Sequence, residues 1–274
     1  MSSASTSLLD ALAHPPHLRF HSHRADPHCE PQFTVVTFMS DDRPQHTNLL
    51  VQSAGIHSQR LVILPWNRSD NYLQKVTSLR DWAQHQCPQS IVMLTDAYDT
   101  FMSCNAARIL RTFRALRTGV LFSVEQLWSW QQDEDKPYYD GIARGPYRYL
   151  NAGGFIGYVS ALLPLLHETK FVRFYKGADQ VAYSHLLATR SNEFNVSFDY
   201  DSKVFYVVSG PDWSSSGLRD ARINHSRPCV MHVPWVLLPR NNATLHTLFL
   251  KYSLGTGDHH VAVGGVSSSP PWGF

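Results

Sequence analysis

The amino-acid sequence predicts an α/β fold with an open central sheet, and two observations carry this prediction. From residue 32 onward, strand-like apolar runs alternate with helical patterns, which is typical of β-α-β units with parallel strands. One such run, residues 91–95, ends at Asp96 and Asp99, as a buried strand does when it delivers ligands to the carboxyl edge of an open sheet. With 274 residues, of which 43% are hydrophobic, the chain can also bury a sizeable core.

The first half of the chain alternates strands with amphipathic helices. Short β-rich runs predict strands at residues 32–39, 60–65, 91–95 and 120–124. Apolar residues three and four apart predict helices at residues 47–57, 73–86 and 106–118. An aromatic loop is expected between residues 125 and 146. Its rings either stack on a sugar or a uracil or pack on the loop's own core, and they are Trp128, Trp130, Tyr138 and Tyr139.

The second half opens on residues 149–158, YLNAGGFIGY, where three glycines follow Asn151. Gly153, Gly154 and Gly157 allow close approach of the backbone to a ligand, and we expect them to mark tight turns next to a strand. Their position in the middle of the chain argues against a dinucleotide-binding fingerprint. The remaining predicted elements are a helix capped by Ser160 at 160–166, helices at 180–188 and 244–252, and strands at 194–200, 203–208 and 228–234.

Composition limits the possible partners and the domain boundaries. The polar, Pro- and His-rich start predicts a flexible leader over residues 1–31, and the Gly/Ser/Pro-rich end predicts a flexible tail over 253–274, with one folded domain over 32–252. No apolar run reaches the ~20 residues of a membrane span. The net charge of +2, without a basic stripe interleaved with aromatics, argues against a nucleic-acid partner.

The compartment stays open at this point. The four cysteines are scattered, without C-x-x-C or zinc-like spacing, and do not fix it. Four N-x-S/T sequons favour the secretory pathway, and they begin at Asn67, Asn195, Asn224 and Asn242. We expect the lumen of the endoplasmic reticulum or Golgi if a signal has been removed, and the cytoplasm otherwise.

Asp96, Asp99 and His232 are the candidate metal ligands. Two aspartates three apart after a strand can hold a hard divalent cation, whose open positions phosphate oxygens fill well. A neutral imidazole is a suitable third ligand. The alternative is that Asp96 is a cap or turn residue, Asp99 is solvated and His232 is packed or on the surface. Asp179, at the start of a predicted helix, is likewise either an N-cap or a site residue.

Several blocks of the chain, taken in order, carry a family resemblance. They are TVVTF (34–38), LQKV (73–76), LTDAYDTF (94–101), LFSVE (121–125), YLNAGGFIGY (149–158), ADQVAY (178–183), FDYDSKVF (198–205) and VMH (230–232). In these blocks the chain resembles the glycosyltransferase domain of the procollagen lysyl hydroxylase and glycosyltransferase family, and more distantly the collagen galactosyltransferases. The resemblance implies a GT-A type, Rossmann-like fold with a mixed central sheet, a UDP-glucose or UDP-galactose donor, and Mn²⁺.

The resemblance also implies roles for individual residues. Asp96 and Asp99 stand in the family's D-x-x-D, its form of the DxD motif, and His232 stands in its late strand, so these three are the expected Mn²⁺ ligands. Asn151 and Asp179 are the expected catalytic residues, which hydrogen-bond the hexose hydroxyls. Asp179 would also stabilise an oxocarbenium-like state in a retaining reaction. The further residues expected to bind the donor are Thr37, Lys75, Gly153, Gly154 and Gln180.

The chain departs from the family pattern in three places. The tryptophan expected shortly after QKV is replaced by residues 77–79, so Tyr72 is a candidate to stack on the uridine. The poly-aspartate run before DQ is reduced to residues 177–179, and the HGNG after the late histidine is here HVPW, residues 232–235. No H-x-D with a distal histidine marks an iron dioxygenase, so lysyl hydroxylation is not expected.

The expected function is therefore a metal-dependent glycosyltransferase that moves glucose or galactose from a UDP-sugar to a hydroxyl acceptor. The acceptor suggested by the resemblance is the (galactosyl)hydroxylysine of a collagen-like protein, and the alternatives are another glycan or a small molecule. Two other readings stay open. One is a catalytically weak UDP-sugar-binding module with a structural or interaction role, which the departures would suit. The other is a metal-dependent phosphoesterase, which usually needs two metals and more ligands than this sequence groups together.

Overall fold

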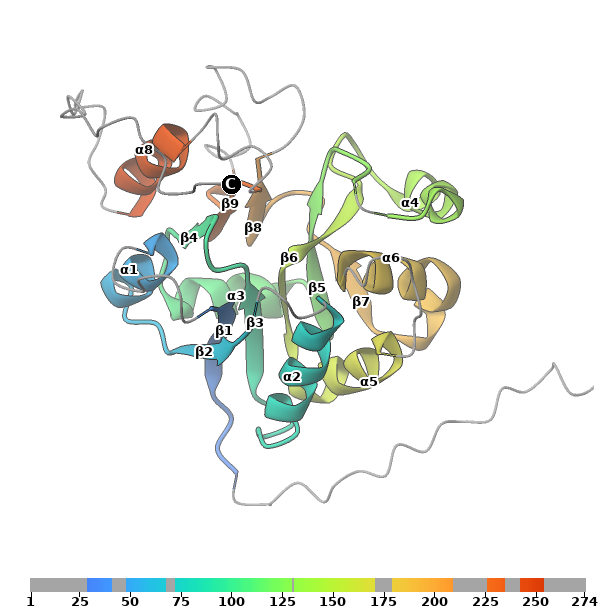
Figure 1. Ribbon diagram of the computed structural model, residues 1–274, viewed down its shortest axis with the longest axis horizontal. Helices are drawn as coiled ribbons and strands as arrows, with labels where there is room; N and C mark the ends of the chain where they lie inside the picture. The colour runs from blue at the N-terminus through green and yellow to red at the C-terminus, as the bar shows by residue number, and fades with distance from the viewer. Residues whose placement is uncertain are drawn as a thin grey trace, which may run out of the picture.

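The structure, a computed structural model, describes residues 29–40, 48–67, 72–129, 131–170, 179–208, 226–234 and 242–253. The expected leader up to residue 28, the start of the first helix at residue 47, Trp130, residues 177–178, Trp235 and the tail from residue 254 lie outside these ranges. Figure 1 shows the described elements, which are helices packed around a central sheet, with a smaller sheet beside it. Within the described ranges, no helix combines the length and the hydrophobicity needed to cross a membrane.

The central sheet has six strands in the order β2-β1-β3-β6-β5-β7. Its members are β1 (Phe33–Met39), β2 (Leu61–Pro65), β3 (Ile91–Thr95), β5 (Val120–Glu125), β6 (Tyr149–Tyr158) and β7 (Val196–Phe198). β1 pairs in parallel with β2 and β3, whereas β6 runs antiparallel to both β3 and β5. β3 and β5 therefore point the same way, and their carboxyl ends share one edge. The predicted α/β fold with a mixed central sheet is confirmed.

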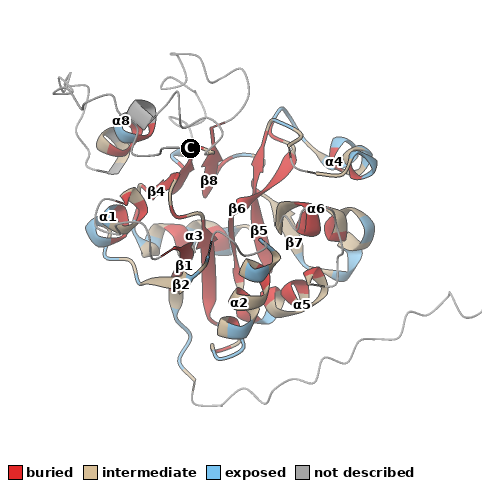
Figure 2. Ribbon diagram, viewed as in Figure 1, coloured by how far each residue is buried: buried red, intermediate tan, exposed pale blue. Residues whose placement is uncertain are grey.

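Two layers of helices cover the sheet, because alternate strand residues face opposite sides. On one side, Val36 packs with apolar residues of α2 (Leu73–Ala83), α5 (Val159–Thr169) and α6 (Asp179–Arg190). On the other side, its neighbour Val35 packs with residues of α1 (Leu49–Ile56) and α3 (Ala106–Ala115). Figure 2 shows the resulting pattern, with buried strands between helices whose outer faces are exposed.

A second, three-stranded sheet lies beyond the carboxyl edge of β3. It consists of β4 (Thr100–Met102), β9 (Val230–His232) and β8 (Phe205–Val207), in the order β4-β9-β8. β4 pairs antiparallel with β9, and β8 runs parallel to β9. The helix α8 (Asn242–Ser253) packs on this sheet, where Phe249 meets Phe101 of β4 with ring centroids 5.8 Å apart. The sequence did not predict β4, which begins directly after Asp99.

Several local expectations are corrected. Gly153, Gly154 and Gly157 do not form turns, because they lie inside the long strand β6. Ser160 is not a cap, since α5 already begins at Val159. The four cysteines, which the sequence left unassigned, form two disulfides, Cys29–Cys87 and Cys104–Cys229.

The aromatic segment between residues 125 and 146 contains a short helical turn, Asp133–Asp135, and the helix α4 (Lys136–Ile142). Tyr139 is fully buried, and its hydroxyl donates to the carbonyl of Ser184 at 2.9 Å. The Trp128 ring packs at 5.1 Å from that of Tyr149. For Trp128 and Tyr139 the structure thus supports packing within the domain over an exposed stacking surface.

Candidate active site

The three candidate metal ligands converge at the junction of the two sheets. Asp96 and Asp99 lie in the turn between β3 and β4, and His232 ends β9. His232 Nε2 is 3.3 Å from Asp99 Oδ2 and 3.9 Å from Asp96 Oδ2, and one ligand atom from each residue lies within 4.8 Å of the others. Two carboxylates and an imidazole at such distances form a donor set that suits a divalent metal.

The local fold explains this convergence. The β4–β9 register places Thr100 opposite His232, so the strand pairing brings the histidine beside Asp99. The backbone N–H of Val233 donates to the Asp99 carbonyl at 2.8 Å and extends the pairing past the strand ends. The backbone N–H of Asp96 donates to Gly153 of β6 at 2.9 Å, which fixes the start of the turn. Neither aspartate caps a helix, and Asp99 is only 4% exposed.

Gly153 provides the space that these ligands occupy. A Cβ at this position would overlap Cε1 of His232 and would lie 2.8 Å from Asp96 Oδ2. Gly154 lies on a neighbouring surface, where a Cβ would come within 2.9 Å of the Phe205 ring. Since neither glycine has a positive φ, space and not backbone conformation accounts for them.

Asn151 orients the imidazole of His232. Its Oδ1 lies 3.1 Å from His232 Nδ1 and also accepts the backbone N–H of Gly153 at 3.0 Å. In the tautomer that donates from Nδ1 to Asn151, the lone pair of Nε2 faces the two aspartates, as a metal ligand requires. Burial lowers the pKa of His232, but the negative charges of Asp99, Asp96 and Glu125 outweigh it and raise that pKa above its ordinary value.

Glu125 is a site residue to which the sequence analysis gave no role. Its carboxylate is buried and accepts from Asn151 Nδ2 at 3.2 Å, Gln180 Nε2 at 3.1 Å and Ser129 Oγ at 3.2 Å. Burial raises the pKa of Glu125, and these hydrogen bonds only partly oppose the rise. Its position in the sequence could have revealed this role, because Glu125 ends β5 and therefore lies at the same sheet edge as Asp96.

Gln180 and Asp179 open helix α6 beside this network. Gln180 accepts from the backbone N–H of Ala152 at 3.0 Å and donates to Glu125 and to the Ser129 carbonyl, so it joins α6 to the strands. Asp179 Oδ1 accepts the backbone N–H of Gln180 at 2.9 Å. Burial raises the pKa of Asp179 to about 6. The negative charge of Asp96 adds to this rise, and the positive charge of Lys75 opposes it.

Lys75 of α2 reaches the same edge. Its Nζ is 3.4 Å from Asp96 Oδ1 and 5.0 Å and 5.1 Å from the ring centroids of Trp66 and Tyr72. Burial lowers the pKa of Lys75, but the charges of Asp96 and Asp179 outweigh this and raise it above its usual value. Burial also pushes the pKa of Asp96 up, but the charges of Lys75 and His232 dominate and hold it below its usual value.

Thr37 differs from the other predicted residues. Its side chain is fully buried in β1, and its hydroxyl donates to the Thr95 carbonyl of β3 at 2.7 Å. It therefore supports the strand that ends at Asp96. The other predicted donor-binding and catalytic residues lie at the sheet edge near Asp96, and they are Lys75, Asn151, Gly153, Asp179 and Gln180. Thr37 instead lies buried within the sheet, and Gly154 packs against Phe205.

Comparison with known proteins identifies the family of this chain. Residues 55–219, more than half of the chain, match the family described as the PLOD GT domain. This range includes Asp96, Asp99 and Asp179, and it ends before His232.

Individual relatives match at low identity. The chain is 28% identical over 195 residues, 66% of its length, to a multifunctional procollagen lysine hydroxylase and glycosyltransferase of Caenorhabditis elegans. It is 26% identical over 142 residues to procollagen-lysine,2-oxoglutarate 5-dioxygenase 2 of Mus musculus, and 28% identical over 141 residues to procollagen-lysine,2-oxoglutarate 5-dioxygenase 1 of Gallus gallus, each covering 50% of this chain. These alignments cover 26%, 19% and 19% of the relatives, so the chain spans about a quarter or less of their length. With its mixed sheet and its family match, the chain belongs to the family of procollagen lysyl hydroxylase (PLOD) glycosyltransferase domains, which have a GT-A type, Rossmann-like fold.

Proposed function

We propose that this chain is a metal-dependent glycosyltransferase domain that transfers glucose or galactose from a UDP-sugar to a hydroxyl group of an acceptor. The observation that carries the proposal is the convergence of Asp96, Asp99 and His232, whose ligand atoms lie within 4.8 Å of one another at the carboxyl edge of the sheet. Such an edge is where open α/β sheets bind ligands. Membership of the PLOD GT domain family supports the same reaction class.

The donor set fits Mn²⁺, because carboxylate oxygens suit this ion and imidazole completes the set. Asp96, Asp99 and His232 are the residues that would hold it, and Gly153 keeps the space beside them free of a side chain. A bound Mn²⁺ would supply Lewis-acid stabilisation for the negative charge of the leaving diphosphate. Asp96 is ready for this role because its lowered pKa keeps the carboxylate ionised at neutral pH.

The protein side chains orient the donor. Lys75, which is 3.4 Å from Asp96, adds a positive charge at the edge where we place the diphosphate. Tyr72 and Trp66, with ring centroids 5.3 Å apart, offer an aromatic surface beside Lys75 for the uracil ring. Tyr72 is 43% exposed, so its ring is accessible to a ligand.

We propose that Asn151 and Asp179 bind the hexose of the donor. Asn151 uses its oxygen on His232 and Gly153 and one amide hydrogen on Glu125, so its second amide hydrogen can reach a hydroxyl of the sugar. Asp179 would accept from a hexose hydroxyl and stabilise an oxocarbenium-like state at the anomeric carbon. Gln180 and Glu125 hold this arrangement through their mutual hydrogen bond at 3.1 Å.

The acceptor and the compartment are inferred from the names of the relatives, the disulfides and the sequons. The names of the relatives point to procollagen lysine, so we propose the (galactosyl)hydroxylysine of a collagen-like chain as the acceptor. Two disulfides join all four cysteines, and structural disulfides persist in oxidising compartments. Together with the sequons, one of which begins at the exposed Asn195, they support a secretory compartment.

The test is release of UDP from UDP-glucose and from UDP-galactose, with galactosyl-hydroxylysine and collagen peptides as acceptors. We expect turnover of one donor with Mn²⁺, loss of turnover with a chelator, and a loss of at least about 100-fold in Asp99→Ala. The matched control is Asp81→Asn, which alters a carboxylate on the exposed side of α2. Binding of UDP without turnover of either donor would favour the sugar-nucleotide-binding module. Hydrolysis of simple phosphoesters without a UDP-sugar would favour the phosphoesterase.

A further inference from the structure

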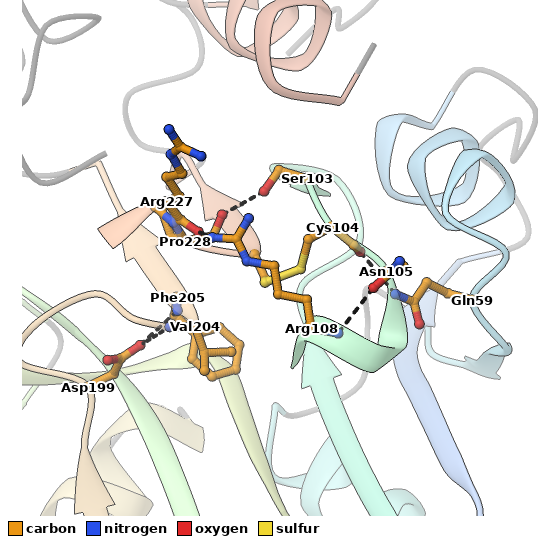
Figure 3. The surroundings of a disulfide bond; sticks show 11 residues. Gln59, Ser103, Cys104, Asn105, Arg108, Asp199, Val204, Phe205, Arg227 and Pro228 are labelled. Atoms are coloured by element: carbon orange, nitrogen blue, oxygen red, sulfur yellow. Dashed lines mark hydrogen bonds between the residues drawn. A yellow bond between two sulfur atoms is a disulfide. The ribbon is translucent and has the colours of Figure 1, made fainter. Parts of the chain in front are cut away.

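The disulfide Cys104–Cys229 lies on the strand pair that carries two of the metal ligands. Cys104 follows β4 and Cys229 precedes β9, with Cα atoms 5.1 Å apart although 125 positions separate them in sequence. Figure 3 shows the bond with Ser103 and Pro228, whose hydroxyl and carbonyl form a hydrogen bond at 2.6 Å. Both cysteines are buried, and the Cys104 carbonyl accepts from Gln59 Nε2 at 3.0 Å.

The crosslink and the ligands lie at opposite ends of one short ladder. Next to the disulfide, the backbone N–H of Ser103 donates to the Cys229 carbonyl at 2.9 Å. The pairing then runs through three residue pairs, the last of which is Thr100 opposite His232. At the far end, the backbone N–H of Val233 donates to the Asp99 carbonyl at 2.8 Å. The disulfide therefore closes the end of the same ladder whose register places His232 beside Asp99.

Register matters here because successive strand residues face opposite sides. A slip of β9 by one residue would turn Met231 toward the aspartates and His232 away from them. Each strand of the small sheet has only three residues, so few ladder hydrogen bonds oppose such a slip. Bringing together two strands that are far apart in the sequence also has an entropic cost, and a crosslink between Cys104 and Cys229 lowers this cost by restricting the unfolded chain.

We propose that Cys104–Cys229 is a positioning crosslink: it keeps β9 in register with β4, and the affinity of the site for a divalent metal depends on it. The expected effect on metal affinity rests on the proposed function, whereas the effect on strand register can be measured in the metal-free chain. Asn151 also holds the imidazole of His232, but it acts on the ring, whereas the disulfide acts on the backbone that delivers the ring.

The second disulfide provides a matched control. Cys29–Cys87 joins the residues before β1 to the segment before β3, which is the amino-terminal edge of these parallel strands. Asp96 and Asp99 lie at the opposite, carboxyl edge. Removing this bond also deletes a crosslink over a long segment, of 58 positions, but leaves the β4–β9 ladder untouched.

The experiment compares Cys104→Ala/Cys229→Ala with Cys29→Ala/Cys87→Ala. Amide hydrogen exchange on the metal-free proteins reports the register through the Ser103 and Val233 amides, and calorimetry with Mn²⁺ alone reports the affinity. For the first variant we expect faster exchange at both amides and at least about tenfold weaker Mn²⁺ binding, the range seen when supports of metal ligands are removed. The control variant should keep native exchange at these amides and native affinity.

A second experiment does not require the Cys104→Ala/Cys229→Ala variant to fold. Dithiothreitol added to Cys29→Ala/Cys87→Ala can reduce only Cys104–Cys229, giving two thiols while the reagent is oxidised to its cyclic disulfide. The same two changes are expected on reduction. Unchanged exchange at Ser103 and Val233 in both experiments would overturn the proposal. If the native chain binds no Mn²⁺, the proposed metal site fails, and the exchange data alone then decide whether the disulfide sets the register.

Discussion

At the scale of single residues, the candidate site consists of the three proposed metal ligands and of the side chains that orient them. Asn151 contacts both His232 and Glu125, and Gln180 contacts Glu125 and the backbone of β6. Partners of this kind set the orientation and tautomer of a metal-binding histidine. The arrangement leaves His232 Nε2 facing the two aspartates, which is the state required for metal binding.

The space at Gly153 can be tested directly. In Gly153→Ala the added Cβ would collide with the His232 ring and the Asp96 carboxylate, so we expect loss of metal binding and a decrease of about 1–3 kcal/mol in unfolding free energy. Calorimetry with Mn²⁺ and chemical denaturation measure the two effects. Gly55→Ala is the control, because its new Cβ would meet no atom within 4 Å beyond the neighbouring residues of its own helix, and alanine favours helix α1. Normal metal affinity in Gly153→Ala would contradict this account of the glycine.

The buried carboxylate of Glu125 should make stability depend on pH. Its pKa is raised in the folded chain by burial, so the folded state binds a proton more tightly than the unfolded state, and stability falls as pH rises from the ordinary glutamate pKa through the raised one. We expect Glu125→Gln, which keeps the accepting oxygen, to raise the melting temperature of the metal-free protein at pH 7–8. Below about pH 4, where glutamate is protonated in both states, this gain should disappear. A gain independent of pH would exclude the ionisation of Glu125 as its cause.

At this scale the sequence predicted the candidate ligands and two of the side chains that contact them or their neighbours, Asn151 and Gln180, but it gave no role to Glu125. Asp96 and Asp99 follow an apolar strand and His232 lies near the end of a late one, which the sequence itself displays, whereas the roles of Asn151 and Asp179 followed from the family blocks. Glu125 ends a strand in the same way, but its role depends on hydrogen bonds from distant segments that no local pattern displays. The donor-binding role expected for Thr37 stays a prediction, and its hydroxyl is used within the sheet.

At the scale of elements, the sequence predicted the helices and strands that carry an apolar pattern, including the three-residue strands β7, β8 and β9, and it missed β4 and α4. The strands and helices of the α/β core follow from apolar runs and from helical spacing. β4 has three residues and begins in the turn of the D-x-x-D, so no periodicity could indicate it. The glycines of β6 looked like turn residues because glycine is rare inside strands, whereas here the packing of His232, Phe205 and neighbouring strands requires them.

The N-cap residue of helix α1 also contacts the turn that carries Asp96 and Asp99. Asn48 accepts the backbone N–H of Val51 and caps α1, and its Nδ2 donates to the carbonyl of Ala97, between the two aspartates, at 2.6 Å. We expect Asn48→Ala to lower the unfolding free energy by about 1–2 kcal/mol and also to weaken Mn²⁺ binding. Asn105→Ala removes only the cap of α3 and should affect stability alone. Equal metal affinities in the two variants, measured by calorimetry, would show that the contact with Ala97 does not support the site.

At the scale of the whole molecule, the two disulfides constrain different sheets: Cys29–Cys87 joins the segments before β1 and β3 of the central sheet, and Cys104–Cys229 joins β4 and β9 of the smaller sheet. Because the entropy of loop closure grows slowly with length, the loss of either crosslink should lower the unfolding free energy by a similar amount, about 2–5 kcal/mol. Denaturant titration of the two double-alanine variants measures this. Stability losses differing by more than about 3 kcal/mol would mean that one bond acts mainly through the folded state.

The central claim is that Asp96, Asp99 and His232 bind the donor through a divalent metal, and the most direct test is UDP binding measured by calorimetry. We expect UDP to bind the native chain with Mn²⁺, to bind at least about tenfold more weakly with a chelator, and to show no Mn²⁺-dependent gain in Asp99→Asn. Asp81→Asn should behave as the native chain. Equal UDP affinity with and without Mn²⁺ in the native chain would contradict the account.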